Sequence, residues 1–226
     1  HEIIRGIRLA TGLSVVLSAD GRLSLSLESG IGRQFPERRP GSNAVLAIGG
    51  GWPAYEFGDG TESRSGILVR NGRSTLKVWR KSGHETPNRL TVEFQDAFRA
   101  YQQTSVSVVD TDDERLQGYE IASTLGALGL PNFNQALRAV RHQLNKTVHG
   151  NRFAEFESGA QALGVRPGDL ITLTVASEGL DRTLFRVLGV SLGTNHATVR
   201  IICREHREEW YSQFETDGTG SGSSAG

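Results

Sequence analysis

One segment of the chain has helical periodicity, while almost everything around it is patterned for strands. Its apolar residues recur every three or four positions: Phe133, Leu137, Val140, Leu144 and Val148. At about 100° per residue they fall within an arc of roughly 80°. Asn132 is the expected N-cap, with Gln135 three residues later as in a capping box, and Gly150 follows the last periodic residue. We therefore predict a helix over residues 133–149 that packs one face against a sheet.

Period-two alternation predicts a hairpin near the N-terminus. Residues 13–17 (LSVVL) and 23–27 (LSLSL) carry Leu or Val at every second position, and Ala19-Asp20-Gly21 lies between them. A two-residue turn would place Leu17 opposite a serine, whereas a three-residue loop with Gly21 at a left-handed bulge position aligns the apolar side chains. The predicted pairs are Leu17 with Leu23, Val15 with Leu25, and Leu13 with Leu27.

A second hairpin is predicted around Asn71-Gly72, because both residues tolerate the positive φ of a type I′ turn. This turn places Ile67 opposite Leu76. Further strands are expected at 44–48, 54–57, 90–94, 105–109, 119–122, 152–157, 170–175, 184–190 and 197–203. The Pro167-Gly168 turn begins the strand at 170. The expected fold class is mainly β with one packed helix (α+β), built of antiparallel β-barrel or sandwich domains.

Composition shifts suggest four parts. Residues 1–30 form an N-terminal hairpin segment, and the charged break at Asp110–Glu114 separates a first β-domain (31–115) from a second (116–213) that contains the helix. Residues 214–226 read as a flexible Gly/Ser tail. Since the sequence has no methionine, we expect it to be a piece of a longer chain.

The charge balance excludes some classes of partner. Lys and Arg total 25, as do Asp and Glu, and a neutral chain is not typical of a nucleic-acid binder, which needs a positive face. A single cysteine rules out an internal disulfide and fits assembly in the cytosol. The sequence contains no run of about 18 apolar residues, so we predict no membrane-spanning helix.

No motif has the spacing of a catalytic, cofactor or metal site. Asp110–Glu114 lacks the Gly and distal Glu of a calcium loop and is interpreted as a solvated turn. His142 and His149 lie two helical turns apart, too far for one metal, and are interpreted as exposed. Cys203 alternates inward with its apolar neighbours and is interpreted as a small buried hydrophobe. We therefore expect no enzyme activity, no cofactor and no bound metal.

Two weaker possibilities stay open. Three aromatic residues on predicted strands could serve as an interface or as a glycan-stacking platform, although core positions are the default: Trp52, Tyr55 and Trp79. Four strand carboxylates could supply a glycosidase pair if the fold brought two of them together: Glu93, Asp96, Glu155 and Glu157.

The order of several short motifs carries a resemblance to a known family. They are Gly51–Gly60, Asn88–Asp96, Leu128–Phe133, Gly150–Arg152, Arg166–Ile171 and Glu209–Tyr211. Together they span roughly residues 40 to 212. In this order the chain resembles phage tail proteins of the tail-tip hub type, which are similar to the tip attachment or host-specificity protein J family.

The resemblance implies a structural role. Hubs of this type sit at the distal end of the tail tube, usually as trimers, and join the tube to the tip machinery. The implied location is the virion tail, assembled in the bacterial cytoplasm, with copies of the chain and other tail proteins as partners. Residues 1–30 would then be part of a hub domain. The alternative is a carbohydrate-binding module for host glycans, and a third possibility is a cell-wall hydrolase domain.

Overall fold

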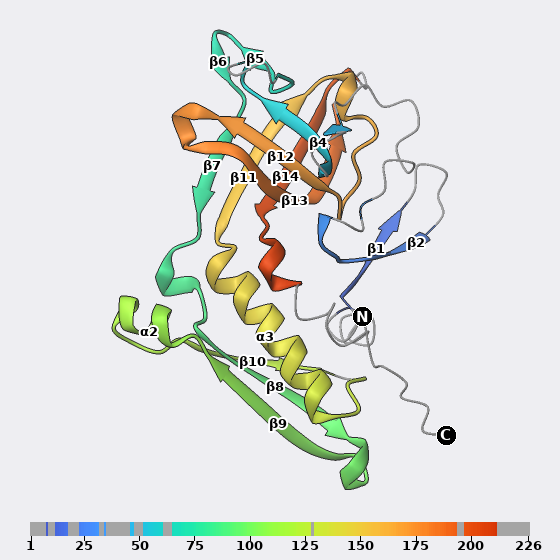
Figure 1. Ribbon diagram of the computed structural model, residues 1–226, viewed down its shortest axis with the longest axis vertical. Coiled ribbons are helices and arrows are strands. Elements are labelled where there is room, and N and C mark those ends of the chain that lie inside the picture. The colour runs from blue at the N-terminus through green and yellow to red at the C-terminus, as the bar shows by residue number, and fades with distance from the viewer. Residues whose placement is uncertain are drawn as a thin grey trace, which may run out of the picture.

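The computed structural model describes the body of the chain and parts of its N-terminal region. The described residues are 8, 12–17, 23–31, 34, 46–47, 52–60, 65–127, 129–193 and 197–211. The fold of the described residues is mainly β, as the sequence predicted, but it has two α-helices where one was expected, and Figure 1 shows it divided into an upper and a lower part. No helix among these residues is long and apolar enough to cross a membrane.

The upper part is a seven-stranded sheet of order β3-β4-β12-β13-β14-β11-β7. Its strands are β3 (Leu46–Ala47), β4 (Trp52–Gly58), β7 (Lys77–Arg80), β11 (Arg152–Ser158), β12 (Leu170–Val175), β13 (Leu180–Leu192) and β14 (Val199–Glu205). Its buried core includes Tyr55, Phe57, Phe156 and Phe185, all 0% exposed. Among the described residues the order ends at β3 and β7, which do not pair, so the sheet is open where a closed barrel was one expectation.

The lower part is a three-stranded sheet covered by a helix. The strands are β8 (Arg89–Asp96), β9 (Gln102–Val109) and β10 (Ala122–Gly126), in the order β10-β8-β9, and the helix is α3 (Phe133–His149). The helix packs on β8 and β9 around a separate core that includes Val92, Phe94 and Val140. The strands are not all antiparallel, because β10 pairs with β8, and β4 with β12, in parallel.

The lower part is inserted between two neighbouring strands of the upper sheet. The chain leaves the sheet at the end of β7, builds the lower part and returns as β11, which pairs with β7. Where the chain leaves and re-enters the sheet, the backbone N–H of Lys81 donates to the carbonyl oxygen of Asn151 at 3.1 Å and joins the two connecting segments. We call residues 82–150 the inserted module. The strands β8 and β9, which α3 covers, precede residue 115, whereas α3 follows it. The predicted domain boundary at residue 115 stays a prediction until the parts are folded separately.

The N-terminal hairpin has the predicted pairing, and the second hairpin has the predicted turn, although its strand pairs cover only 69–70 with 73–74 and do not include the expected pair of Ile67 and Leu76. In β1 (Leu13–Leu17) and β2 (Leu23–Leu27), Leu13 lies opposite Leu27, Val15 opposite Leu25 and Leu17 opposite Leu23. The loop residue Gly21 lies outside the described residues. In β5 (Val69–Arg70) and β6 (Arg73–Ser74), the turn residues Asn71 and Gly72 have φ of 51° and 73°, as a type I′ turn requires.

Helix α3 has the predicted bounds, with two differences in detail. The Asn132 side chain accepts from the N–H of Gln135 at 2.9 Å, which confirms the N-cap. Phe133 is 47% exposed, so the buried stripe is Ala136, Val140, Leu144 and Val148. Gly150 has a φ of −99°, and the reason for glycine there is space: a Cβ would lie 2.7 Å from both the Lys146 carbonyl oxygen and the Trp210 ring.

The acidic run that was interpreted as a solvated turn is in fact a helix. Asp110 caps α2 (Thr111–Gln117) by accepting from the N–H of Asp113 at 3.0 Å. The acidic residues lie in its first turn, where their negative charges interact favourably with the helix dipole. The remaining helical turns are 3-10 segments: η4 (Gly83–Glu85), η5 (Ala97–Arg99), η6 (Ala160–Ala162), η7 (Ala176–Glu178) and η8 (Glu208–Trp210).

Candidate functional site

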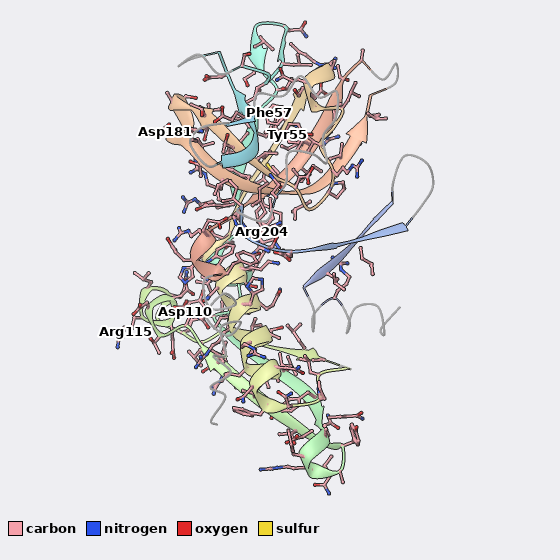
Figure 2. The ribbon with its side chains drawn as sticks, turned by 45° about the vertical axis from the view of Figure 1, so that its right-hand side comes forward. Tyr55, Phe57, Asp110, Arg115, Asp181 and Arg204 are labelled. Atoms are coloured by element: carbon pink, nitrogen blue, oxygen red, sulfur yellow. The ribbon has the colours of Figure 1, made fainter. Side chains whose placement is uncertain are left out.

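The most unusual group of side chains lies where the upper sheet, the inserted module and the N-terminal hairpin meet. We call it the junction cluster, and its members are Glu28, His142, Lys146, Arg186, His206, Glu208 and Tyr211. They come from the residue after β2, from α3, from β13 and from the chain after β14. Figure 2 shows Arg204, which borders the cluster, between the two parts of the molecule.

Glu28 is the centre of the junction cluster. Lys146 Nζ donates to its two carboxylate oxygens at 2.6 and 2.8 Å, and the Tyr211 hydroxyl donates to Oε1 at 2.7 Å. Arg186 Nε lies 3.6 Å from the same oxygen. Burial alone would raise the pKa of Glu28, but the two cations and the hydrogen bonds lower it to about 2. The carboxylate is therefore ionised at neutral pH.

The two histidines of the cluster are largely buried. Burial lowers the pKa of His142 to about 4, and the nearby Lys146 cation adds to this effect. Its ring meets the Tyr211 ring edge-on, with centroids 4.9 Å apart. This position corrects the interpretation of His142 as an exposed residue. Burial also lowers the pKa of His206, which donates from Nε2 to Glu208 Oε1 at 2.9 Å.

The cluster fastens the N-terminal segment to the rest of the molecule. Arg186 donates to the backbone oxygen of Ser29, and the N–H of Ile31 donates to Glu208 Oε1 at 2.8 Å. Beside it lies a cavity of about 210 Å³, lined by Leu13, Glu28, Leu125, Ala139, His142 and Lys146. Because each charge in the cluster already has a partner, the arrangement is suited to holding three segments together rather than to binding substrate.

Sequence reasoning missed this cluster for a physical reason. Glu28 and Lys146 are 118 positions apart, and Glu28 and Tyr211 are 183 apart. Each is a single polar residue with no local motif around it, so only the tertiary fold brings them together.

The structure separates the aromatic residues singled out in the sequence. Tyr55 is 0% exposed in β4, inside the sheet core (Figure 2), whereas Trp79 is 40% exposed on β7. Four strands lie between β4 and β7 in the sheet order, so the two rings do not form one platform. The side chain of Trp52 lies outside the described residues.

The candidate carboxylates each have their own structural partner. Glu155 pairs with Arg200 at 2.6 Å, and Glu157 with Arg70 at 2.6 Å. Asp96 accepts from the N–H of Phe98 at 3.0 Å, and Glu93 accepts from Gln103 at 3.1 Å.

The other titratable candidates also have structural surroundings. Cys203 is 0% exposed and burial raises the pKa of its thiol, as expected for a small core residue. His149 Nε2 lies 3.0 Å from Asp110. In the part of the chain that the structure describes, no group of three His, Cys, Asp or Glu residues could hold a metal ion.

Comparison with known proteins gives a family and a fold. Residues 62–190 match the model of a family described as "Putative phage tail protein". No curated protein sequence matches the chain. Among solved structures, a chain from the virion of a native gene transfer agent particle matches at 14% identity and a TM-score of 0.64, over 92% of this chain and 39% of that one. The likeness shows a shared fold.

Two further solved structures are similar at lower scores. The tail protein of Neisseria meningitidis MC58 matches at 14% identity and a TM-score of 0.49, over 88% of this chain and 52% of that one. The 43 kDa tail protein of prophage MuSo2 from Shewanella oneidensis matches at 12% identity and a TM-score of 0.49, over 93% and 55%. The chain thus spans between 39% and 55% of the length of these three relatives.

Proposed function

This chain belongs to the family of phage tail proteins whose model its residues 62–190 match, and from that premise we propose that it is a structural subunit of the tail-tip or baseplate hub. In this role it joins the tail tube to the tip machinery. Its partners are copies of itself in a ring, a trimer in the full-length protein, and other tail proteins. Its place of action is the virion tail, and its role is structural rather than enzymatic.

The observation that carries the proposal is the way the two parts of the molecule are joined. A connecting subunit must hold two surfaces in a fixed relation while its neighbours pull on both. Here the inserted module is tied to the sheet through the β7–β11 pair and through the junction cluster, where Lys146 of α3 binds Glu28 at 2.6 Å. The same cluster holds the N-terminal segment through Arg186 and Glu208.

A nonsense mutation in the gene of the full-length protein tests the proposal. We expect the phage or prophage to release particles without a finished tail tip, visible by electron microscopy, because a hub subunit is needed for assembly. Complementation with the wild-type gene should restore complete tails. Complete tails in the mutant would contradict a hub role.

The glycan-binding alternative rests on the exposure of Trp79. A glycan array probed with the purified chain tests it directly, with Trp79→Ala as the matched variant. We expect no binding by either protein. Tyr55 is buried, and among the described residues the ring that stacks on the exposed Trp79 is the buried Phe153, so the surface offers a single aromatic ring there. Binding by the wild-type chain that is lost in Trp79→Ala would favour the alternative.

A further inference from the structure

The outer end of the seven-stranded sheet carries a concentration of positive charge. Residues 69–81 contain five Lys or Arg and no Asp or Glu, although the whole chain has 25 of each sign. Three of their exposed side chains lie on one face of β7, the end strand of the sheet, or directly after it, and we call them the β7 surface: Lys77, Trp79 and Lys81. Such a local excess in a neutral chain points to an acidic partner.

Trp79 is a rigid apolar centre within this surface. Its ring stacks on Phe153, with centroids 5.8 Å apart and planes at 15°, and it is still 40% exposed. Lys81 Nζ lies 5.5 Å from the centre of the Phe153 ring. A preorganised aromatic ring flanked by cations is typical of the residues that dominate protein–protein contacts.

The two cations of the β7 surface have no carboxylate partner among the described residues, since no ion pair there involves Lys77 or Lys81. Because charged side chains on an end strand also discourage strand addition, the partner should contact side chains rather than extend the sheet.

Helix α2 has the complementary surface. Leu116 is 85% exposed, and Asp112 and Asp113 lie four and three residues before it, on the same side of the helix. We call these three residues the α2 surface. The neighbouring Arg115 approaches Asp112 at 3.6 Å, but both side chains are at least 80% exposed, and such pairs contribute little. Figure 2 shows Arg115 at the outer edge of the molecule, so α2 is accessible.

We propose that the β7 surface of one copy binds the α2 surface of a neighbouring copy. Leu116 packs on Trp79, and Asp112 and Asp113 pair with the cations around it. Within one chain the two surfaces are not in contact, since Trp79 and Leu116 are both exposed, and Figure 1 shows β7 and α2 as separate features. The contact joins two different patches, as the interfaces of a closed ring do. This inference rests on the proposed function as a ring-forming hub subunit.

Charge reversal and its rescue test this contact. Sedimentation velocity would compare the wild-type chain with Lys77→Glu/Lys81→Glu, with Asp112→Lys/Asp113→Lys, and with all four changes combined. We expect each pair of changes alone to weaken self-association about tenfold or more at low salt, because attraction becomes repulsion. The combined variant should return to within about threefold of wild type, because the opposite charges face each other again.

The matched control is Arg99→Glu/Arg141→Glu, which changes the net charge as much as Lys77→Glu/Lys81→Glu at two exposed arginines elsewhere. It should leave self-association unchanged. Raised salt should weaken association of the wild-type and combined chains alike. Thermal melts would confirm that all variants fold.

The outcomes separate this contact from the proposed function. If the wild-type chain associates and neither reversal weakens it, the contact is wrong and ring assembly stands. If the combined variant fails to recover, the β7 surface binds another acidic partner, and α2 is not its occupant. A wild-type chain that stays monomeric at every concentration would overturn the contact and the self-association, while the nonsense mutant would still decide the role in the tail.

Discussion

At the scale of single residues, His142 should make the fold sensitive to mildly acidic pH. Its pKa is about 4 in the fold against 6.5 when unfolded, so the unfolded chain binds more protons between these values. The free energy of unfolding should therefore fall as the pH drops from about 6.5 to about 4. Urea unfolding across this range would measure it. His142→Gln should reduce this slope, and the part that remains should include the contribution of His206, whose pKa is also lowered by burial.

Glu28 should control stability in a lower pH range. Its pKa is lowered from 4.5 to about 2, so its contribution is present above pH 4.5 and is lost as the pH falls through 2. The shift corresponds to about 3 kcal/mol. Glu28→Gln should cost a similar amount at neutral pH and flatten the acid limb of the unfolding curve. Glu93→Gln, an exposed carboxylate, is the control, and equal effects of the two changes would contradict the role of the junction cluster.

At the scale of elements, α3 should be essential to the inserted module. Val140 is 0% exposed in the core of that module, and a carboxylate there would be buried without a partner. Val140→Asp should lower the free energy of unfolding by about 3 kcal/mol or more. Leu137→Asp should cost less, because Leu137 is only partly buried. Hydrogen exchange in β8 and β9 would report the change, with Arg141→Asp on the exposed face as control; a wild-type exchange pattern in Val140→Asp would disprove the packing.

The elements that could be predicted from the sequence are those specified by local patterns. Helix α3 follows from its periodicity and its Asn132 cap, and the β5–β6 turn follows from Asn71-Gly72. Helix α2 was missed because its seven residues are too short to show a periodic stripe. The parallel pairing of β4 with β12 joins residues more than 100 positions apart, and no local signal specifies such a partner.

At the scale of the whole molecule, local sequence patterns also do not specify which segments share a core. The sequence suggests a cut near residue 115, because a charged run resembles a linker. In the structure, one hydrophobic core contains only residues between 90 and 148 and the other contains none of them, while the boundary near residue 115 stays a prediction. Charge patterns mark solvent exposure, whereas a folding unit is defined by which apolar side chains share a core.

The separation of the two cores leads to a prediction for the molecule as a whole. Residues 82–150 can be replaced by Asn-Gly, since Lys81 and Asn151 already pair at 3.1 Å and Arg80 lies opposite Arg152. We expect the shortened chain to keep a cooperative thermal melt, because the core of the large sheet loses no member. Its midpoint should fall, because Glu28 loses Lys146 and keeps only Arg186 and Tyr211.

The matched comparison is the same shortened chain carrying Glu28→Gln. In the full chain this substitution breaks the Lys146 pair, but in the shortened chain that pair is already absent, so the two changes should be less than additive. Differential scanning calorimetry of the four proteins would measure the coupling. A shortened chain without a cooperative transition would show that the large sheet depends on the inserted module for its folding, and full additivity would show that Lys146 does not stabilise Glu28.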